Sequence, residues 1–411
     1  MAIALPALQA DFLRYVQINT RSDEHAAINR VPTTSGQTVL AKMLVAQLTA
    51  MGLQAVQLNP NNGYVTATLP ANTTKKAPTI GFIAHLDTAD YNADAVHPQL
   101  HPHYQGENIQ WANGLKLTVE DFPALKQYFG QTLITGDGTT LLGVDDKAGI
   151  AAAIAAIRAL QAQPALQHGA VKLAFGPDEE IGRGADRFDV PGFAADFAYT
   201  LDNGNLGDIE YETFNAAQAE VTIQGVSVHP GEAKGLMVNA LSLAIALDQA
   251  LPALERPEYT AEREGFNLLL QLDGTVAHAR AVYIIRDFDH DHFLARKAQF
   301  VAAIKALNAA YASPRITYTM SDQYYNMADI IAKDMTPVHL AEAAIRQVGL
   351  TPQIVPFRGG TDGSKITYQG LPTPNLFNGG INFHGPYEAV SLEAMGKLAE
   401  TLVAIATLAM K

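Results

Sequence analysis

Three apolar runs, each ending in histidine or acidic residues, restrict most strongly the folds open to this chain. They are PTIGFIAHLD from residue 78, AVKLAFGPDEEIG from residue 170 and DFAYTLDNG from residue 196. Strands that are apolar on both faces are typical of sheets covered by helices. A long helix rich in Ala, Ile and Leu is expected after residue 146, between the first two runs. The alternation of strands and helices predicts an α/β fold.

Polar side chains stand at the end of each run. His85 and Asp87 follow the first run, and side chains two positions apart on a strand point to the same side. Ligands gather outside the carboxyl ends of strands in open α/β sheets. Each residue also has an ordinary interpretation: Asp146 suits a helix cap, Glu179 and Glu180 suit a solvated strand end, and the histidines suit loops.

The composition narrows the chemistry. The chain has 411 residues, which favours two domains, and it has no cysteine, so a metal must be held by His nitrogen and carboxylate oxygen. A net charge of −13 without a run of Lys or Arg argues against nucleic acid as a partner. No apolar stretch is long enough for a membrane span and no signal peptide is recognised, so we expect no membrane partner and a cytoplasmic location.

Residues 214–325 differ in character from the rest. They show the order strand, helix, strand, helix, strand, which suits a small α+β domain inserted into a larger one. The predicted domains are therefore 1–213 plus 326–411, carrying the strand ends, and 214–325.

The strand ends would carry several carboxylates into one place if they converge in a sheet. Like charges that close are unfavourable without a cation. Two histidines and three carboxylates, one of them shared, suit two neighbouring divalent ions of a hydrolytic site. Glu179 is then placed to take a proton from a metal-bound water, and Asp87 to hold the imidazole of His85.

Seven motifs strengthen this interpretation by their order and spacing: HLDT, GVDDKAG, PDEE, YTLDNG, SVHPG, RGGTDGS and NFHG. In this the chain resembles the tripeptide aminopeptidases of the co-catalytic zinc exopeptidase family, which also includes carboxypeptidase G, dipeptidases and aminoacylases. The resemblance implies a mixed-sheet catalytic domain with an inserted lid and dimerisation domain. It also implies a homodimer formed through that insertion.

The resemblance implies a role for each matching residue. One zinc would be bound by His85 and Asp202, and the second by Glu180 and His384. Asp145 would bridge the two ions and be joined to Asp146 by a cis peptide. Asp87 and Glu179 would be the catalytic residues, the first orienting an imidazole and the second acting as general base.

Substrate contacts are implied in and near the insertion. His229 resembles a histidine that stabilises the oxyanion. Arg358 and Gly360 lie in a loop suited to the terminal carboxylate of a peptide. Arg286 and Asn326 are also expected near the substrate, with ion pairing to neighbouring acidic residues as the alternative for Arg286.

The predicted function is hydrolysis of the first peptide bond of a tripeptide by a metallo-aminopeptidase holding two zinc ions per subunit, with cobalt or manganese as alternatives. The alternatives on the same scaffold are a dipeptidase, a carboxypeptidase and an N-acyl amino acid deacylase. A metal-binding relative without catalysis is a further alternative, which the intact Glu179 and Asp87 disfavour.

Overall fold

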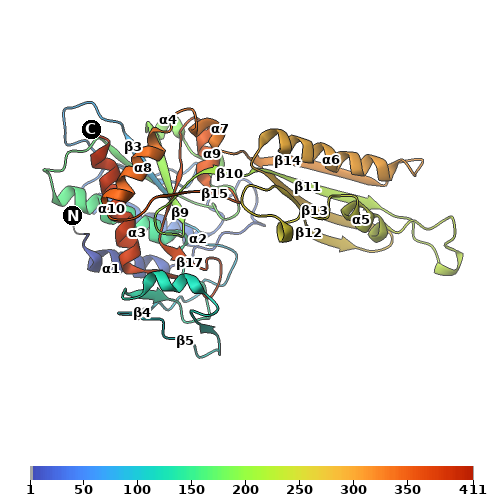
Figure 1. Cartoon of the computed structure of the whole chain (residues 1–411), viewed down its shortest axis with the longest axis horizontal. Coiled ribbons are helices and arrows are strands. Elements are labelled where there is room, and N and C mark those ends of the chain that lie inside the picture. Colours follow the sequence, from blue (N-terminus) through green and yellow to red (C-terminus); the bar gives the residue numbers. More distant parts are fainter. Residues whose placement is uncertain (1–2, 411) are drawn as a thin grey trace. The chain divides into compact units, whose positions relative to one another are not determined.

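The structure is a computed structural model that describes residues 3–410, and the chain divides into two compact units. The larger unit comprises residues up to 211, residues 329–355 and residues from 361 onward. The smaller unit comprises residues 212–328 and 356–360. Figure 1 shows the elements of both units with their labels. Among the described residues no helix combines the length and apolarity that crossing a membrane requires.

An eight-stranded mixed sheet forms the centre of the larger unit, in the order β1-β2-β8-β3-β9-β16-β10-β15. Its middle strands β8, β3, β9 and β16 run parallel, whereas β1, β2 and β10 pair antiparallel with their neighbours. The predicted α/β class is thus confirmed. The strands are β1 (Gln54–Leu58), β2 (Val65–Leu69), β3 (Ile80–His85), β8 (Val171–Gly176), β9 (Phe197–Asn203), β10 (Asp208–Thr213), β15 (Gln353–Phe357) and β16 (Asn375–Phe377).

Strand β3 is buried along its whole length, as its continuous apolar run predicted. Gly81 is required in it because a Cβ there would stand 2.5 Å from the ring of Phe193. On the same face Ile83 packs with Phe193 and Ile366. This tight packing holds the end of β3, and with it His85, in place.

Helices cover the sheet of the larger unit. Helix α3 packs against β3 and β9 as well as against α1 and α10, which explains why nearly all of its residues are buried and why its sequence is apolar on every side. Figure 1 shows α3 and α10 beside the strands. The helices are α1 (Leu5–Val16), α2 (Ser35–Ala50), α3 (Val144–Ala162), α4 (Val190–Phe193), α7 (Ala328–Ile331), α8 (Thr336–Gln347), α9 (Asp362–Tyr368) and α10 (Leu392–Leu408).

A second sheet of the larger unit was not predicted. It has the order β17-β18-β7-β4, and a two-stranded pair β5-β6 belongs to the same stretch of chain. Its core gathers aromatic side chains around Trp111 and Tyr128. Strands of two or three residues carry too little periodicity to be recognised in a sequence. They are β4 (Gln99–His101), β5 (Ile109–Gln110), β6 (Lys116–Leu117), β7 (Leu133–Thr135), β17 (Gly380–Ile381) and β18 (Ala389–Ser391).

The smaller unit is an antiparallel sheet, β12-β13-β11-β14, with two helices packed on it. Its elements are β11 (Asn215–Gln224), α5 (Ala240–Gln249), β12 (Phe266–Gly274), β13 (His278–Asp287), α6 (His290–Asn308) and β14 (Ile316–Tyr324). The predicted order omitted β12, which forms a hairpin with β13. Its burial does not alternate, so the period-two signal of a half-buried strand is weak there.

Candidate metal centre

The carboxyl ends of three parallel strands meet in the larger unit. Strand β3 pairs with β8 on one side and with β9 on the other, and His85 lies level with Gly176 of β8. Glu179 and Glu180 follow β8 directly, and Asp202 lies near the end of β9. The convergence that the strand ends predicted is therefore present in the structure.

His85 is buried and has a partner at each ring nitrogen. Its Nε2 lies 2.8 Å from Asp145 Oδ1 and 3.5 Å from Asp202 Oδ1. Its Nδ1 lies 3.0 Å from the backbone oxygen of Asp87. A carbonyl accepts only, so Nδ1 carries a proton. Carboxylate oxygens also accept only, so Nε2 is protonated as well unless a cation takes its lone pair.

Asp145 lies between the two histidines. Its Oδ1 faces His85, and its Oδ2 lies 3.2 Å from Nε2 of His384. The same Nε2 of His384 is 3.2 Å from Glu180 Oε2. The two oxygens of one carboxylate thus address two separate imidazoles, which is the arrangement needed to bridge two cations. The peptide from Asp145 to Asp146 is cis, as the resemblance implied.

Asp87 is fully buried and holds the turn that follows β8. Its Oδ1 accepts the N–H of Glu179 at 2.9 Å, and its Oδ2 accepts the N–H of Glu180 at 3.1 Å. Its carboxylate is 3.5 Å from Nδ1 of His85, farther than its own backbone oxygen. Asp87 therefore touches His85 mainly through the main chain, while its side chain positions the two glutamates.

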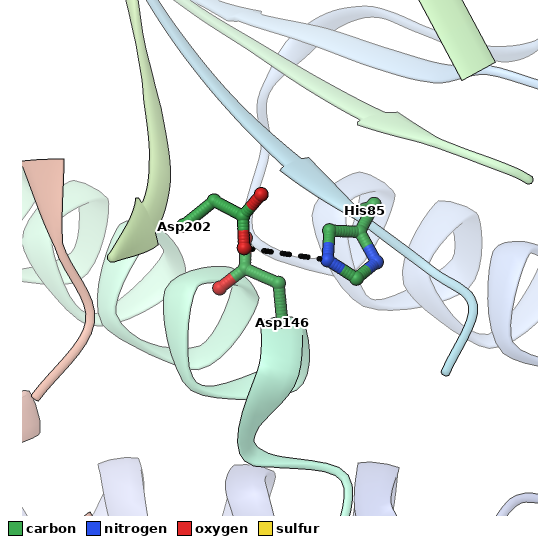
Figure 2. Close-up of side chains that lie close together, drawn as sticks. All are labelled: His85, Asp146 and Asp202. Atoms are coloured by element: carbon green, nitrogen blue, oxygen red, sulfur yellow. Dashed lines mark ion pairs between the residues drawn. The ribbon is translucent and has the colours of Figure 1, made fainter. Parts of the chain in front are cut away.

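Asp146 joins the cluster, although its position before a helix suggested a cap. Asp145 and Asp146 lie within the bounds of α3 but have non-helical backbone angles, so the regular helix starts after them. Asp146 Oδ1 accepts the N–H of Gly149 at 3.1 Å and caps that regular helix. Ligand atoms of His85, Asp146 and Asp202 also lie within 4.8 Å of one another, as do those of His85, Asp145 and Glu180. Figure 2 shows the first group, with its ion pair between His85 and Asp202.

The cluster carries a strong excess of negative charge. Burial and the Asp145 carboxylate raise the pKa of Asp202 well above its usual range, and burial and Asp202 do the same for the pKa of Glu179. Against the effect of burial, hydrogen bonds to the two histidines hold the pKa of Asp145 low. Hydrogen bonds to Asp145 and Glu180 raise the pKa of His384 to about 11. Protonated histidine thus supplies positive charge that a divalent cation would also supply.

The donor set fits such cations. Among residues 3–410, Asp146 Oδ2 and Glu180 Oε1 are buried side-chain oxygens without a hydrogen-bond partner, and an unpaired buried oxygen is costly. Imidazole nitrogen with carboxylate oxygen is a zinc-type set, which cobalt and manganese also accept. A pair of divalent ions at these atoms would pair both oxygens and offset the charge.

The predicted substrate residues belong to the smaller unit, where four have partners. Arg358 donates to the backbone oxygens of residues 262 and 264, each at 2.9 Å, and its guanidinium lies over the rings of two phenylalanines. Arg286 donates to backbone oxygens and to a glutamine side chain, not to its acidic neighbours. Asn326 is buried and accepts the N–H of Thr213 at 2.9 Å. His229 Nδ1 accepts the N–H of residue 231 at 3.1 Å.

Gly360, the fifth of these residues, is held by close packing. A Cβ there would lie 2.4 Å from the ring of Tyr324. Its contacts, like those of Arg358, Arg286 and Asn326, are explained within the smaller unit. Contact of these residues with a substrate stays a prediction.

Three buried carboxylates near the centre were not given a role from the sequence. Asp178 accepts the N–H of Thr33 at 3.0 Å, and Asp362 accepts the N–H of Ala185 at 3.0 Å. Glu388 accepts backbone N–H groups of the segment before Asp146. The first two lie inside quoted motifs and the third lies four residues after His384, so proximity to a predicted ligand was the available signal.

The sequence of the chain is similar to those of known peptidases. A family model described as "Peptidase family M20/M25/M40" matches residues 135–408. The chain is 50% identical to Peptidase T of Limosilactobacillus fermentum over 400 residues, which is 97% of this chain and 96% of that one. It is 51% identical to Peptidase T of Streptococcus thermophilus over 405 residues, 98% and 99% of the two chains.

Solved structures share the fold. An aminopeptidase PepT from Bacillus cereus matches with a TM-score of 0.80 at 24% identity over 100% of both chains. A dinuclear metal-binding peptidase of the M20 family from Bacillus subtilis matches with a TM-score of 0.66 at 14% identity over 98% of both chains. The strand ends bring together histidines and carboxylates that could hold metal ions. Half of the residues of the chain are identical to those of relatives of nearly the same length. This chain belongs to peptidase family M20/M25/M40.

Proposed function

We propose that the chain is a metal-dependent aminopeptidase that removes the first residue of tripeptides. The relatives named Peptidase T, about half identical over almost the whole chain, support the activity. The observation that carries the chemistry is Asp145, whose two carboxylate oxygens face His85 and His384 separately. The tripeptide preference rests on the similarity to the relatives named Peptidase T.

Each residue of the centre has a task in this proposal. His85 and Asp202 would hold one ion and Glu180 and His384 the other, with Asp145 between them. A divalent pair supplies a Lewis acid for the scissile carbonyl and a lowered pKa for water. Zinc is the ion that we propose, because the donor set contains nitrogen and oxygen without thiolate.

Glu179 is the proposed general base. It stands beside the ligand Glu180, and the buried Asp87 fixes its backbone by accepting its N–H at 2.9 Å. Burial and neighbouring carboxylates raise its pKa, which suits a group that takes a proton from water and returns it to the leaving amine. Replacing Glu179 by Gln should lower kcat by about 10²–10⁴-fold, the usual contribution of a positioned base.

Asp146 has two uses in this arrangement. Its capping bond to α3 holds the start of that helix next to Asp145. One of its carboxylate oxygens lies within 4.8 Å of ligand atoms of His85 and Asp202, and its Oδ2 has no hydrogen-bond partner, so Asp146 could accept a cation as well. Metal counting on Asp146→Asn would separate the two uses, since the amide retains an oxygen for the cap.

The test of the function compares free and blocked peptides. A free tripeptide, its N-acetylated form and a dipeptide are offered to the metal-free protein after zinc, cobalt or manganese has been restored. An aminopeptidase cleaves the free tripeptide and fails on the blocked one. Cleavage of the acetylated peptide would instead identify a deacylase or a carboxypeptidase, and retention of activity in Glu179→Gln would contradict the assigned base.

We also propose that the smaller unit acts as the lid and forms a homodimer. Strand β14 supports the homodimer, because it is an edge strand whose side chains are largely exposed. Light scattering of the protein, with Tyr318→Lys on that edge as the variant, tests the assembly. The contribution of His229 to the oxyanion and the cytoplasmic location stay predictions from the sequence.

A further inference from the structure

Glu388 is a buried carboxylate to which the peptidase chemistry above gives no task. Its side chain is 1% exposed. Its Oε2 accepts the N–H groups of Leu142 at 2.8 Å and Gly143 at 2.6 Å, and its Oε1 accepts the N–H of Asp145 at 3.1 Å. Three main-chain donors of one short segment therefore converge on a single carboxylate.

The segment is shaped to make this convergence. Gly143 has φ of +84°, in the left-handed region that favours glycine, and so turns successive N–H groups toward the same side. A side chain at this position would also meet Lys147 Nζ at 3.4 Å and Thr88 Cγ2 at 3.5 Å. The backbone before Asp145 is thus a concave set of donors that Glu388 fills.

These three N–H donors require an acceptor with two equivalent oxygens. A carboxylate accepts at both oxygens, whereas an amide of the same shape accepts at one and donates at the other. With Gln at position 388, an NH₂ group would face either the N–H of Asp145 or those of Leu142 and Gly143. Two donors facing each other in a buried site leave both without a partner, so the segment must move.

Glu388 also ties together two loops that carry proposed metal ligands. The segment that it binds leads directly into Asp145, and its own loop carries His384 four residues earlier. Its backbone N–H donates to the oxygen of Gly385 at 3.3 Å, and the strand that starts at the next residue pairs with β7 and β17. The bridge and one of its histidines are therefore fixed relative to each other through one side chain.

We propose that Glu388 is a positioning residue that sets the orientation of the Asp145 carboxylate and so makes both metal sites bind at the same time. This role of Glu388 rests on the proposed function of Asp145 as the shared ligand and does not depend on which peptide is cut. Because Asp145 serves both ions, misplacing it should weaken both, whereas misplacing an ordinary ligand should weaken one.

The test is metal affinity of the folded, metal-free protein, measured with a zinc-chelating dye in competition. Glu388→Gln should lower the affinity for both zinc ions by about 10–100-fold, the usual effect of losing a group that orients a ligand. The cobalt-loaded variant should show altered visible absorption bands. A purely structural role would lower the unfolding temperature and leave the affinity of the folded fraction unchanged.

Glu393 supplies the matched control. It is a glutamate of the same part of the chain, and it accepts the backbone N–H of Thr132 at 2.8 Å and the hydroxyl of that residue at 3.2 Å. Thr132 is not among the residues of the metal cluster. Glu393→Gln should therefore change stability and leave zinc affinity at the wild-type value.

Further variants keep the proposal open to refutation. Glu388→Asp retains both oxygens but is shorter, so it should give an intermediate loss of affinity, and it stands in if the Gln variant does not fold. Wild-type affinity in either folded variant would overturn the proposal. Asp145→Asn separates this failure from failure of the site itself: if that variant binds zinc normally, Asp145 is not the ligand and the metal centre is wrongly assigned.

Discussion

Two sites of this protein, one in each unit, balance the charge of their buried carboxylates in opposite ways. In the smaller unit Asp287 is 3% exposed and lies 2.6 Å from the guanidinium Nε of Arg296. In the larger unit the side chains of Asp145, Glu180 and Asp202 are 10%, 8% and 12% exposed, and within residues 3–410 their ion pairs are with histidines alone. The Asp287 site therefore contains its own permanent cation, and the carboxylates at the strand ends do not.

The difference shows why the two buried sites serve different ends. An arginine is always charged and its guanidinium matches the geometry of a carboxylate, so Arg296 balances the negative charge of Asp287. A histidine that carries its charge only when protonated can release it, and an imidazole freed of its proton is a metal ligand. The strand-end site thus keeps its carboxylates available to an external cation, whereas the Asp287 site uses its carboxylate for packing.

The largest expected effect comes from removing the shared carboxylate. Asp145→Asn should lower peptidase activity by about 10³-fold or more, since a metal pair contributes several kcal/mol to the transition state. It should also lower bound metal, measured by elemental analysis. Asp287→Asn is the counterpart in the smaller unit and should leave metal content unchanged. Equal metal loss in both variants would erase the distinction between the two sites.

Removing the internal cation should have the next largest effect, on stability. Arg296→Met leaves Asp287 buried without its partner, which should cost about 3–5 kcal/mol of unfolding free energy. Urea unfolding, monitored by hydrogen exchange in β11 and β13, measures this loss of unfolding free energy. The control is Arg280→Met, which breaks an ion pair with Glu220 whose side chains are 47% and 48% exposed and which should cost less than about 1 kcal/mol.

Adding an external cation should stabilise one unit selectively. At a free zinc concentration 100 times the dissociation constant, binding should add about 2.7 kcal/mol to the stability of the larger unit. Hydrogen exchange should slow in β3 and in residues 178–180 and remain the same in β11 of the smaller unit. Uniform protection of both units would show that the cation does not act at the strand ends.

The smallest expected effect concerns Glu210, a buried carboxylate of β10 whose Oε2 accepts from Asn375 Nδ2 at 2.7 Å. Burial raises its pKa from 4.5 to about 8. The folded state then holds a proton that the unfolded state releases, so this group costs stability increasingly as pH rises from about 4.5 to 8. Below the unfolded pKa it costs nothing.

Glu210→Gln should remove this cost, because the amide keeps an oxygen for Asn375 and carries no charge. The gain in unfolding free energy should be absent near pH 4.5 and on the order of 2 kcal/mol at about pH 6, which lies about one and a half units above the unfolded pKa, and it should continue to grow toward pH 8. Urea titrations of both proteins across this range measure it. A gain that does not change with pH would show that Glu210 is already ionised in the folded state.

Much of the larger unit could be predicted because its signals are local. The run before His85 is apolar at every position and β3 is buried at every position, and the long apolar helix after Asp146 is present as α3. Polar residues at the ends of such strands predicted where a cation would bind, since parallel strands bring their ends to one edge. The family followed from motifs whose order a single sequence displays.

Other features depend on contacts between residues distant in sequence. The side chain of Glu388 accepts from residues more than 240 positions away, and that of Asp178 accepts from residues more than 140 positions away. Hydrogen bonds of this kind leave no periodicity and no spacing to recognise. The short strands β4 to β7 were missed for a related reason, because two or three residues do not establish a period.

The sequence by itself determined which residues could bind a cation: without cysteine, the donors had to be the histidines and carboxylates at the ends of apolar strands. Only the tertiary structure decided how they act together. It turned the two oxygens of Asp145 toward different histidines, drew Asp146 into the cluster, and enclosed the Arg358 guanidinium among backbone carbonyls. The reason is physical: residue type sets which atoms can donate or accept, whereas direction and burial arise only when distant segments pack.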